Sequence, residues 1–131
     1  MAELTELQQA RVDAKMAEID HAYGSDIRDL LKEISKTRLK NKGKLTLEPV
    51  IENNSLRWTL SWKEQQKISL ELHVIVSVED DGHAAKVSRV WVHRHASTSV
   101  DYEGHTPTTR MRRLASLSID EIREAIDAEW S

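Results

Sequence analysis

Cysteine is absent from this chain of 131 residues, and glycine and proline are scarce, with four and two residues. Without cysteine there is no disulfide framework, no thiolate nucleophile and no cysteine-ligated zinc or iron–sulfur site. Four scattered glycines supply no loop that could surround a phosphate, and neither G-x-G-x-x-G nor a Walker motif is present. These absences exclude the familiar signatures of cysteine chemistry and nucleotide binding, and we expect no cofactor.

Long apolar runs are missing as well. The longest apolar runs, such as Val74-Ile75-Val76, are far shorter than the roughly 20 residues that a bilayer-spanning helix needs. The N-terminal residues are acidic and amide-bearing, whereas a secretory signal needs a basic flank before an apolar stretch. We therefore expect a cytoplasmic protein without membrane attachment. With 39% hydrophobic and 31% charged residues, the composition predicts one globular domain over residues 1–131.

Helical periodicity marks the first third of the chain. A stripe at positions i, i+4, i+7 and i+11 predicts an amphipathic helix that begins with a capping box at Thr5 and ends at Gly24; it consists of Val12, Met16, Ile19 and Tyr23. Ser25 then predicts the start of a second helix with its own complete stripe over residues 27–34. So short a connection implies either an antiparallel helical hairpin or one long helix kinked at Gly24. Because the second stripe suffices to cover a sheet, we expect the first to bind a protein partner or a second copy, as in a homodimer. Burial within its own domain is the alternative.

After Gly43 the hydrophobic period changes to two, which predicts strands. Trp58 and Trp62 share one parity with Leu56 and Leu60 on the second strand, and the same parity is apolar throughout residues 68–78. We expect both tryptophans in the core. Asn53-Asn54 and Asp80-Asp81-Gly82 predict tight turns, Pro49 predicts an edge strand, and the broken alternation near Ser88-Arg89 predicts a bulge.

Helix signals return in the C-terminal part. Thr106-Pro107 predicts the start of a short helix containing Met111 and Leu114, and Ser118 with Glu121 predicts a capped final helix. The predicted fold class is α+β, with two N-terminal helices, a four-stranded antiparallel β-meander, and a C-terminal helix or helices on one sheet face. The predicted ranges are a helical region at 1–43, a sheet at 44–95, and a loop with the C-terminal helical region at 96–131.

Basic residues gather in two segments of an otherwise acidic chain. Residues 36–44 hold five basic and no acidic residues, and residues 84–113 hold six basic and two acidic ones. An alternative function is therefore binding of nucleic acid through phosphate contacts; the candidate residues are Lys36, Arg38, Lys40, Lys42, Arg110, Arg112 and Arg113. Against it, lysines at a helix C-terminus also complement the helix dipole, and the isoelectric point is about 6.1.

Three histidines give a further alternative, a metal-dependent enzyme. His93 and His95 lie two residues apart on a predicted strand and so share a face, and His105 follows ten residues later. No HExxH motif or nucleophile elbow accompanies them, so we expect neither a metal site nor catalytic residues. The preferred prediction is a small non-catalytic binding protein that acts through a macromolecular partner or self-association.

Overall fold

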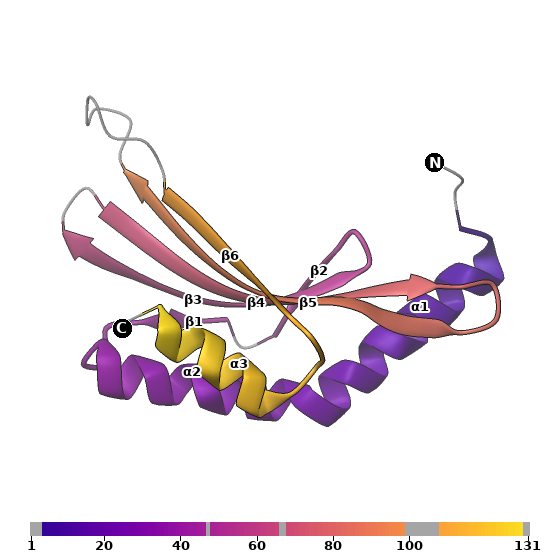
Figure 1. Cartoon of the computed structure of the whole chain (residues 1–131), viewed down its shortest axis with the longest axis horizontal. Helices are drawn as coiled ribbons and strands as arrows, with labels where there is room; N and C mark the ends of the chain where they lie inside the picture. Colours follow the sequence, from indigo (N-terminus) through magenta and orange to yellow (C-terminus); the bar gives the residue numbers. More distant parts are fainter. Residues whose placement is uncertain (1–3, 47, 66–67, 99–107, 130–131) are drawn as a thin grey trace.

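The computed structural model describes residues 4–46, 48–65, 68–98 and 108–129. One helical layer covers one face of an antiparallel sheet, as Figure 1 shows, so the α+β class is confirmed. In chain order the elements are α1 (Glu6–Ile19), the π-helical turn η1 (Asp20–Gly24), α2 (Ser25–Arg38), β1 (Lys44–Leu45), β2 (Val50–Glu52), β3 (Ser55–Gln65), β4 (Ile68–Asp80), β5 (Ala85–Thr98), β6 (Thr108–Leu114) and α3 (Ile119–Ala128).

The N-terminal region is one bent helical rod, so of the two arrangements that the sequence left open, the structure contains the single long helix and not the antiparallel hairpin. Thr5 caps α1 through the expected reciprocal hydrogen bonds with Gln8. Ser25, however, is helical, with φ −63°, and no side chain caps α2. Gly24 is buried inside the rod, where a Cβ atom would meet the carboxylate of Asp20. The glycine therefore permits a close contact within the rod and does not end a helix.

Within the described residues the sheet contains six strands, two more than predicted. Its order is β1-β3-β4-β5-β6, and β2 pairs with the same edge of β3 as β1 does. Pro49 separates the two short strands β1 and β2, which confirms the prediction of an edge at this proline. Asn53 and Asn54 form the expected turn, both with positive φ. The predicted bulge also occurs, because Ser77 pairs with Arg89 and Val78 with Val87.

The last strand, β6, replaces the predicted short helix around Met111 and Leu114. Met111 lies opposite His93 and Leu114 opposite Val90, so the segment extends the sheet along the free edge of β5. Pairing with a long neighbouring strand supplies hydrogen bonds for the whole segment, which a short isolated helix lacks. The sheet therefore continues beyond residue 95, and one C-terminal helix remains.

The core lies between the helical rod, α3 and the even-numbered residues of β3 and β4. Trp58 is fully buried and Trp62 nearly so, as predicted. Leu70, Leu72, Val74 and Val76 are also buried, which confirms the predicted register.

The stripe predicted as a partner interface belongs to this core. Val12, Met16 and Ile19 are at most 3% exposed, and Tyr23 packs against the same cluster. Because α1 extends below the long hairpin of β4 and β5 (Figure 1), it covers sheet area that α2 and α3 leave free. The structure thus shows the arrangement given as the alternative to a partner interface, in which the stripe is buried within its own domain.

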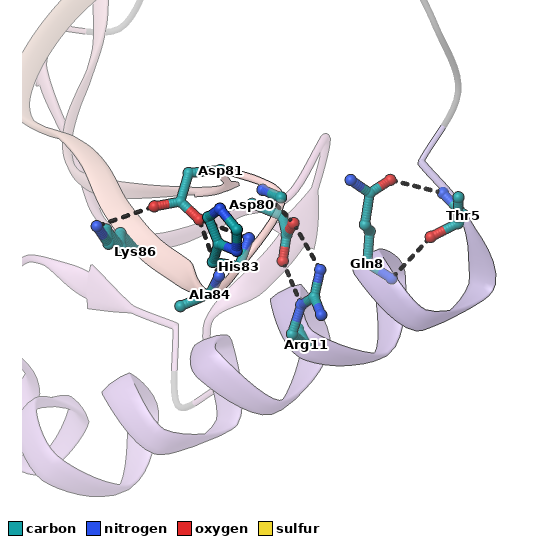
Figure 2. Close-up of polar contacts among 9 residues, drawn as sticks. Thr5, Gln8, Arg11, Asp80, Asp81, His83, Ala84 and Lys86 are labelled. Carbon is teal, nitrogen blue, oxygen red and sulfur yellow. Dashed lines mark hydrogen bonds and ion pairs between the residues drawn. The ribbon is translucent and has the colours of Figure 1, made fainter.

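A bidentate ion pair fastens α1 to the tip of that hairpin, as Figure 2 shows. Arg11 donates to Asp80 through Nε at 2.6 Å and Nη2 at 2.9 Å. These hydrogen bonds hold the pKa of Asp80 below its ordinary value. Asp81 accepts hydrogen bonds from the backbone N–H groups of His83 and Ala84 and so shapes the turn, which explains the paired carboxylates structurally.

Candidate functional site: the open face of the sheet

The sheet has a second face, which no helix of the described residues covers (Figure 1). We call it the open face. Successive side chains of a strand point to opposite faces, so the odd-numbered residues of β3 and β4 lie here, opposite the buried even-numbered ones, as do those of β5 from Arg89 onward. Before the bulge the parity of β5 is reversed, because Val87 pairs with Val78 and packs against the core. Two rows cross all four long strands in register: Arg57, Ile75, Trp91 and Arg113, and beside them Thr59, His73, His93 and Met111.

His73 is the most buried polar side chain of the open face, at 8% exposure. Its Nδ1 lies 2.8 Å from the hydroxyl of Thr59, and its Nε2 lies 2.9 Å from a carboxylate oxygen of Glu71. A neutral ring that donates through Nε2 and accepts through Nδ1 satisfies both contacts. Burial lowers the pKa of His73, and the nearby charge of Glu71 only partly offsets this.

Aromatic rings continue from His73 along β5. The ring centroids of His73 and His93 are 5.5 Å apart, and those of His93 and His95 are 6.2 Å apart. Trp91 precedes them on the same face, and the guanidinium of Arg89 lies 5.6 Å from the centre of its ring. Burial, followed by the charge of His95, lowers the pKa of His93. The result is a strip of half-buried rings in the middle of an uncovered surface.

Several nitrogens on this surface are buried but have no hydrogen-bond partner among the described residues: Arg57 Nε, Trp91 Nε1 and His93 Nε2. The arginine and tryptophan nitrogens can only donate. A buried donor without an acceptor is costly, and such groups are rare in folded proteins. Trp58 Nε1, in the core, is also buried without a hydrogen-bond partner in the described ranges, so unpartnered nitrogens are not confined to the open face.

A cavity of about 570 Å³ adjoins the open face at the β1 edge. Three lysines surround it: Lys42 and Lys44, from the segment before β3, and Lys63, near the end of β3. Ser61 and Glu71 line it as well, and Trp62 and Leu70 contribute apolar surface. We call it the lysine pocket. It lies beside a third cross-strand row, in which Ser61 pairs with Glu71 and Glu71 with His95.

The two predicted basic segments lie on opposite edges of the sheet and do not form one cluster. Lys36 and Lys40 are exposed at the end of α2 and in the following loop, and Arg38 pairs with Asp127 of α3 at 3.4 Å. Of the first segment's candidates, only Lys42 reaches the lysine pocket.

The second segment is divided between the two faces of β6. Arg113 pairs with Trp91 and lies on the open face, whereas Arg112 pairs with Val92 and lies on the helix side. Arg110 pairs with Arg94 along the backbone, and its side chain lies outside the described residues. Strand alternation therefore separates arginines that a helix would have gathered.

The histidine candidates for a metal site are only partly placed. His93 and His95 are neighbours on the open face, and His105 lies outside the described residues. In the ranges that the structure covers, no group of three or more histidine, aspartate or glutamate side chains could hold a metal ion.

No family model, curated protein or solved structure matches this chain. Within the described residues, no helix combines the length and apolar character needed to cross a membrane. The open face is therefore the feature of the molecule from which a function can be inferred.

Sequence reasoning missed most of this site. It identified the shared face of His93 and His95 but not the contributions of His73, Trp91 and Arg57. One signal was present in the sequence, because Trp91, His93 and His95 share a single parity on β5. The apolar residues Val90 and Val92 of the other parity concealed it, because a strand with both parities apolar is also compatible with burial on both faces.

Proposed function

We propose that this chain is a non-catalytic binding protein that receives a macromolecular partner on the open face. One observation carries the proposal: a surface that no described helix covers holds half-buried rings and buried donors without partners. Helices of the same chain already cover the opposite face, so folding leaves this side free. Unpartnered donors on a free surface favour a partner that supplies acceptors.

The hydrogen-bonded chain of Thr59, His73 and Glu71 resembles the hydroxyl, base and carboxylate of a nucleophilic enzyme. Engagement of both ring nitrogens of His73 fits such a chain. A missing oxyanion site argues against catalysis, because a nucleophile also needs nearby N–H donors for a developing oxyanion. The surrounding backbone belongs to continuously paired strands, whose N–H groups are used within the sheet. We therefore infer that these two hydrogen bonds orient the His73 ring and support the open face.

A matched pair of variants tests the proposal. The open-face variant combines Arg57→Gln with Arg113→Gln. The helix-side variant combines Lys32→Gln with Arg123→Gln, which removes the same charge from exposed positions on α2 and α3. Each tagged protein is expressed in the native host, isolated, and examined for bound proteins by mass spectrometry and for bound nucleic acid by sequencing.

We expect the parent and the helix-side variant to retain a common partner that the open-face variant loses. Light scattering on the same samples detects self-association through this face. Equal retention by all three proteins would contradict the proposal, because the partner would then bind elsewhere.

A further inference from the structure

We propose that the partner of the open face is single-stranded nucleic acid, with bases stacked on the ring strip and phosphates bound by the flanking cations. The inference depends on the proposed function, because it names the ligand class for the same surface. Three independent features support it: the sign of the charge, the arrangement of the rings, and the absence of a groove-reading element among the described residues.

Charge complementarity gives the first argument. Arg57 and Arg113 stand at the two ends of one cross-strand row, and Trp91 lies between them. Neighbouring strands are about 4.8 Å apart, so three strand spacings place the backbones of the two arginines about 14 Å apart. Two carboxylates lie on this side of the sheet near the row: Glu71 is already bonded to His73, and Glu52 lines a hollow beside Arg57. A polyanion would therefore meet cations on both sides of the rings.

The lysine pocket extends this cationic surface to the opposite edge. Lys63 lies on the face of β3 that also carries Arg57 and Thr59, and Lys42 and Lys44 complete the pocket from the neighbouring segment. The row of Arg113 itself ends on Arg57 and Val50 of β2. A ligand that crosses the open face diagonally, from Arg113 to the row of Ser61, ends among the three lysines. An extended chain with repeated charges fits this path better than a compact anion does.

Ring stacking gives the second argument. Base stacking on aromatic side chains is the common way in which proteins hold unpaired bases, and an arginine over the ring adds to it. Trp91 and His93 occupy alternate positions of one strand, which places their rings in sequence along the surface. The unpartnered nitrogens of Arg57 and Trp91 can donate to phosphate or base oxygens there.

Single strands are favoured over duplexes by the shape of the site. Reading a duplex requires a helix or a β-ribbon that enters a groove. In the part of the chain that the structure describes, the helices lie on the other side of the sheet (Figure 1). A strand-borne surface instead accepts bases whose faces are already exposed. Its few large apolar side chains, such as Ile75 and Met111, offer little of the apolar core that a protein interface contains.

The test is a fluorescence anisotropy titration with a labelled oligothymidine of about 12 nucleotides, a length within single-strand site sizes. A duplex of equal length and unlabelled heparin serve as competitors, and salt is varied. We expect the parent to bind the oligonucleotide more tightly than the duplex, and heparin to compete weakly. The open-face variant should lose at least about tenfold in affinity, with a salt slope smaller by about 1.4 for two lost phosphate contacts. The helix-side variant should bind like the parent.

Trp91→Leu separates stacking from charge. Loss of one stacked base predicts a decrease in affinity of about 5- to 150-fold at an unchanged salt slope. Circular dichroism of each variant confirms that it is folded, and the double glutamine variant provides the test should the leucine variant unfold.

Three outcomes would overturn the inference: no binding of the oligonucleotide at low salt, equal binding by the open-face and helix-side variants, or tighter binding of the duplex. If the oligonucleotide does not bind while the open-face variant loses a protein from the host isolation, the proposed function stands and the nucleic-acid inference fails. If neither experiment distinguishes the two variants, both proposals fail.

Discussion

The same strands build both faces of the sheet, and the two faces show opposite properties. The helix-covered face presents Trp58, Leu72 and Val74, all fully buried. The open face presents His73, Trp91 and Arg57 from the same or neighbouring strands, half-buried for the most part. Alternation along each strand therefore lets one sequence specify a core and a polar surface at once. We assign folding to the covered face and binding to the open face, and each prediction below tests this division.

The largest expected effect is on the covered face. Leu72→Ala removes a fully buried side chain between β3 and β5 and should lower the free energy of unfolding by about 2–5 kcal/mol. Ile75→Ala, on the half-buried open face, is the matched control and should cost about 1 kcal/mol. Urea denaturation measures both. Equal losses would contradict the division between the faces.

A smaller effect is expected where α3 closes over the covered face. The hydroxyl of Ser118 accepts a hydrogen bond from the backbone N–H of Glu121 and so caps the helix. Ser118→Ala should destabilise the protein by about 1 kcal/mol. Ser118→Asp should retain most of the stability that the alanine variant loses, because aspartate also caps helices. Thermal unfolding followed by circular dichroism provides the comparison. Loss of stability in both variants would show that packing around Ser118, rather than capping, matters.

Acid should destabilise the protein through the open face. Burial lowers the pKa of His73 and His93 below the ordinary value of 6.5 in the folded protein, so the unfolded chain binds protons first. The free energy of unfolding should therefore fall as the pH decreases through about 6.5 and should level off below the folded pKa values.

His73→Gln should remove part of that decrease, because it deletes one of the two histidines. His83→Gln, at the exposed hairpin turn, is the control and should leave the pH profile as in the parent. Denaturation at pH 7 and pH 5 gives the difference for each protein. A profile unchanged by His73→Gln would assign the acid sensitivity to other groups.

The smallest effect on stability is expected for the open-face variant. Both arginines lie on the uncovered face, so their replacement by glutamine should change the free energy of unfolding by no more than about 0.5 kcal/mol. The same change should strongly reduce binding. Guanidinium denaturation alongside the binding titration checks both parts. A large loss of stability would mean that Arg57 or Arg113 supports the fold.

Sequence reasoning succeeded where a pattern is local. The capping box at Thr5, the turns at Asn53 and Asp80, and the core parity of β3 and β4 depend on spacing within a few residues, and the structure contains them all. It failed where tertiary contacts decide. Residues 108–114 form a strand because the edge of β5 is available for pairing, and neither segment shows this by itself.

Two further errors have the same origin. The stripe of Val12 and Met16 was expected to bind a partner because the second helix and the C-terminal helix were thought to fill the sheet face, whereas α1 covers part of β4 and β5 that they leave free. The arginines at 112 and 113 were grouped into one basic segment because they are adjacent in the sequence, and a strand separates them onto two faces. Knowledge of strand order would have corrected both.

The most direct measurement uses two indole N–H groups, one on each face, that have no hydrogen-bond partner among the described residues: Trp91 Nε1 on the open face and Trp58 Nε1 in the core. In a nitrogen–proton NMR titration with the single-stranded oligonucleotide, we predict that the Trp91 indole signal shifts and the Trp58 signal does not. A shift confined to Trp58, or titration of neither signal under conditions in which the oligonucleotide binds, would contradict the assignment of binding to the open face.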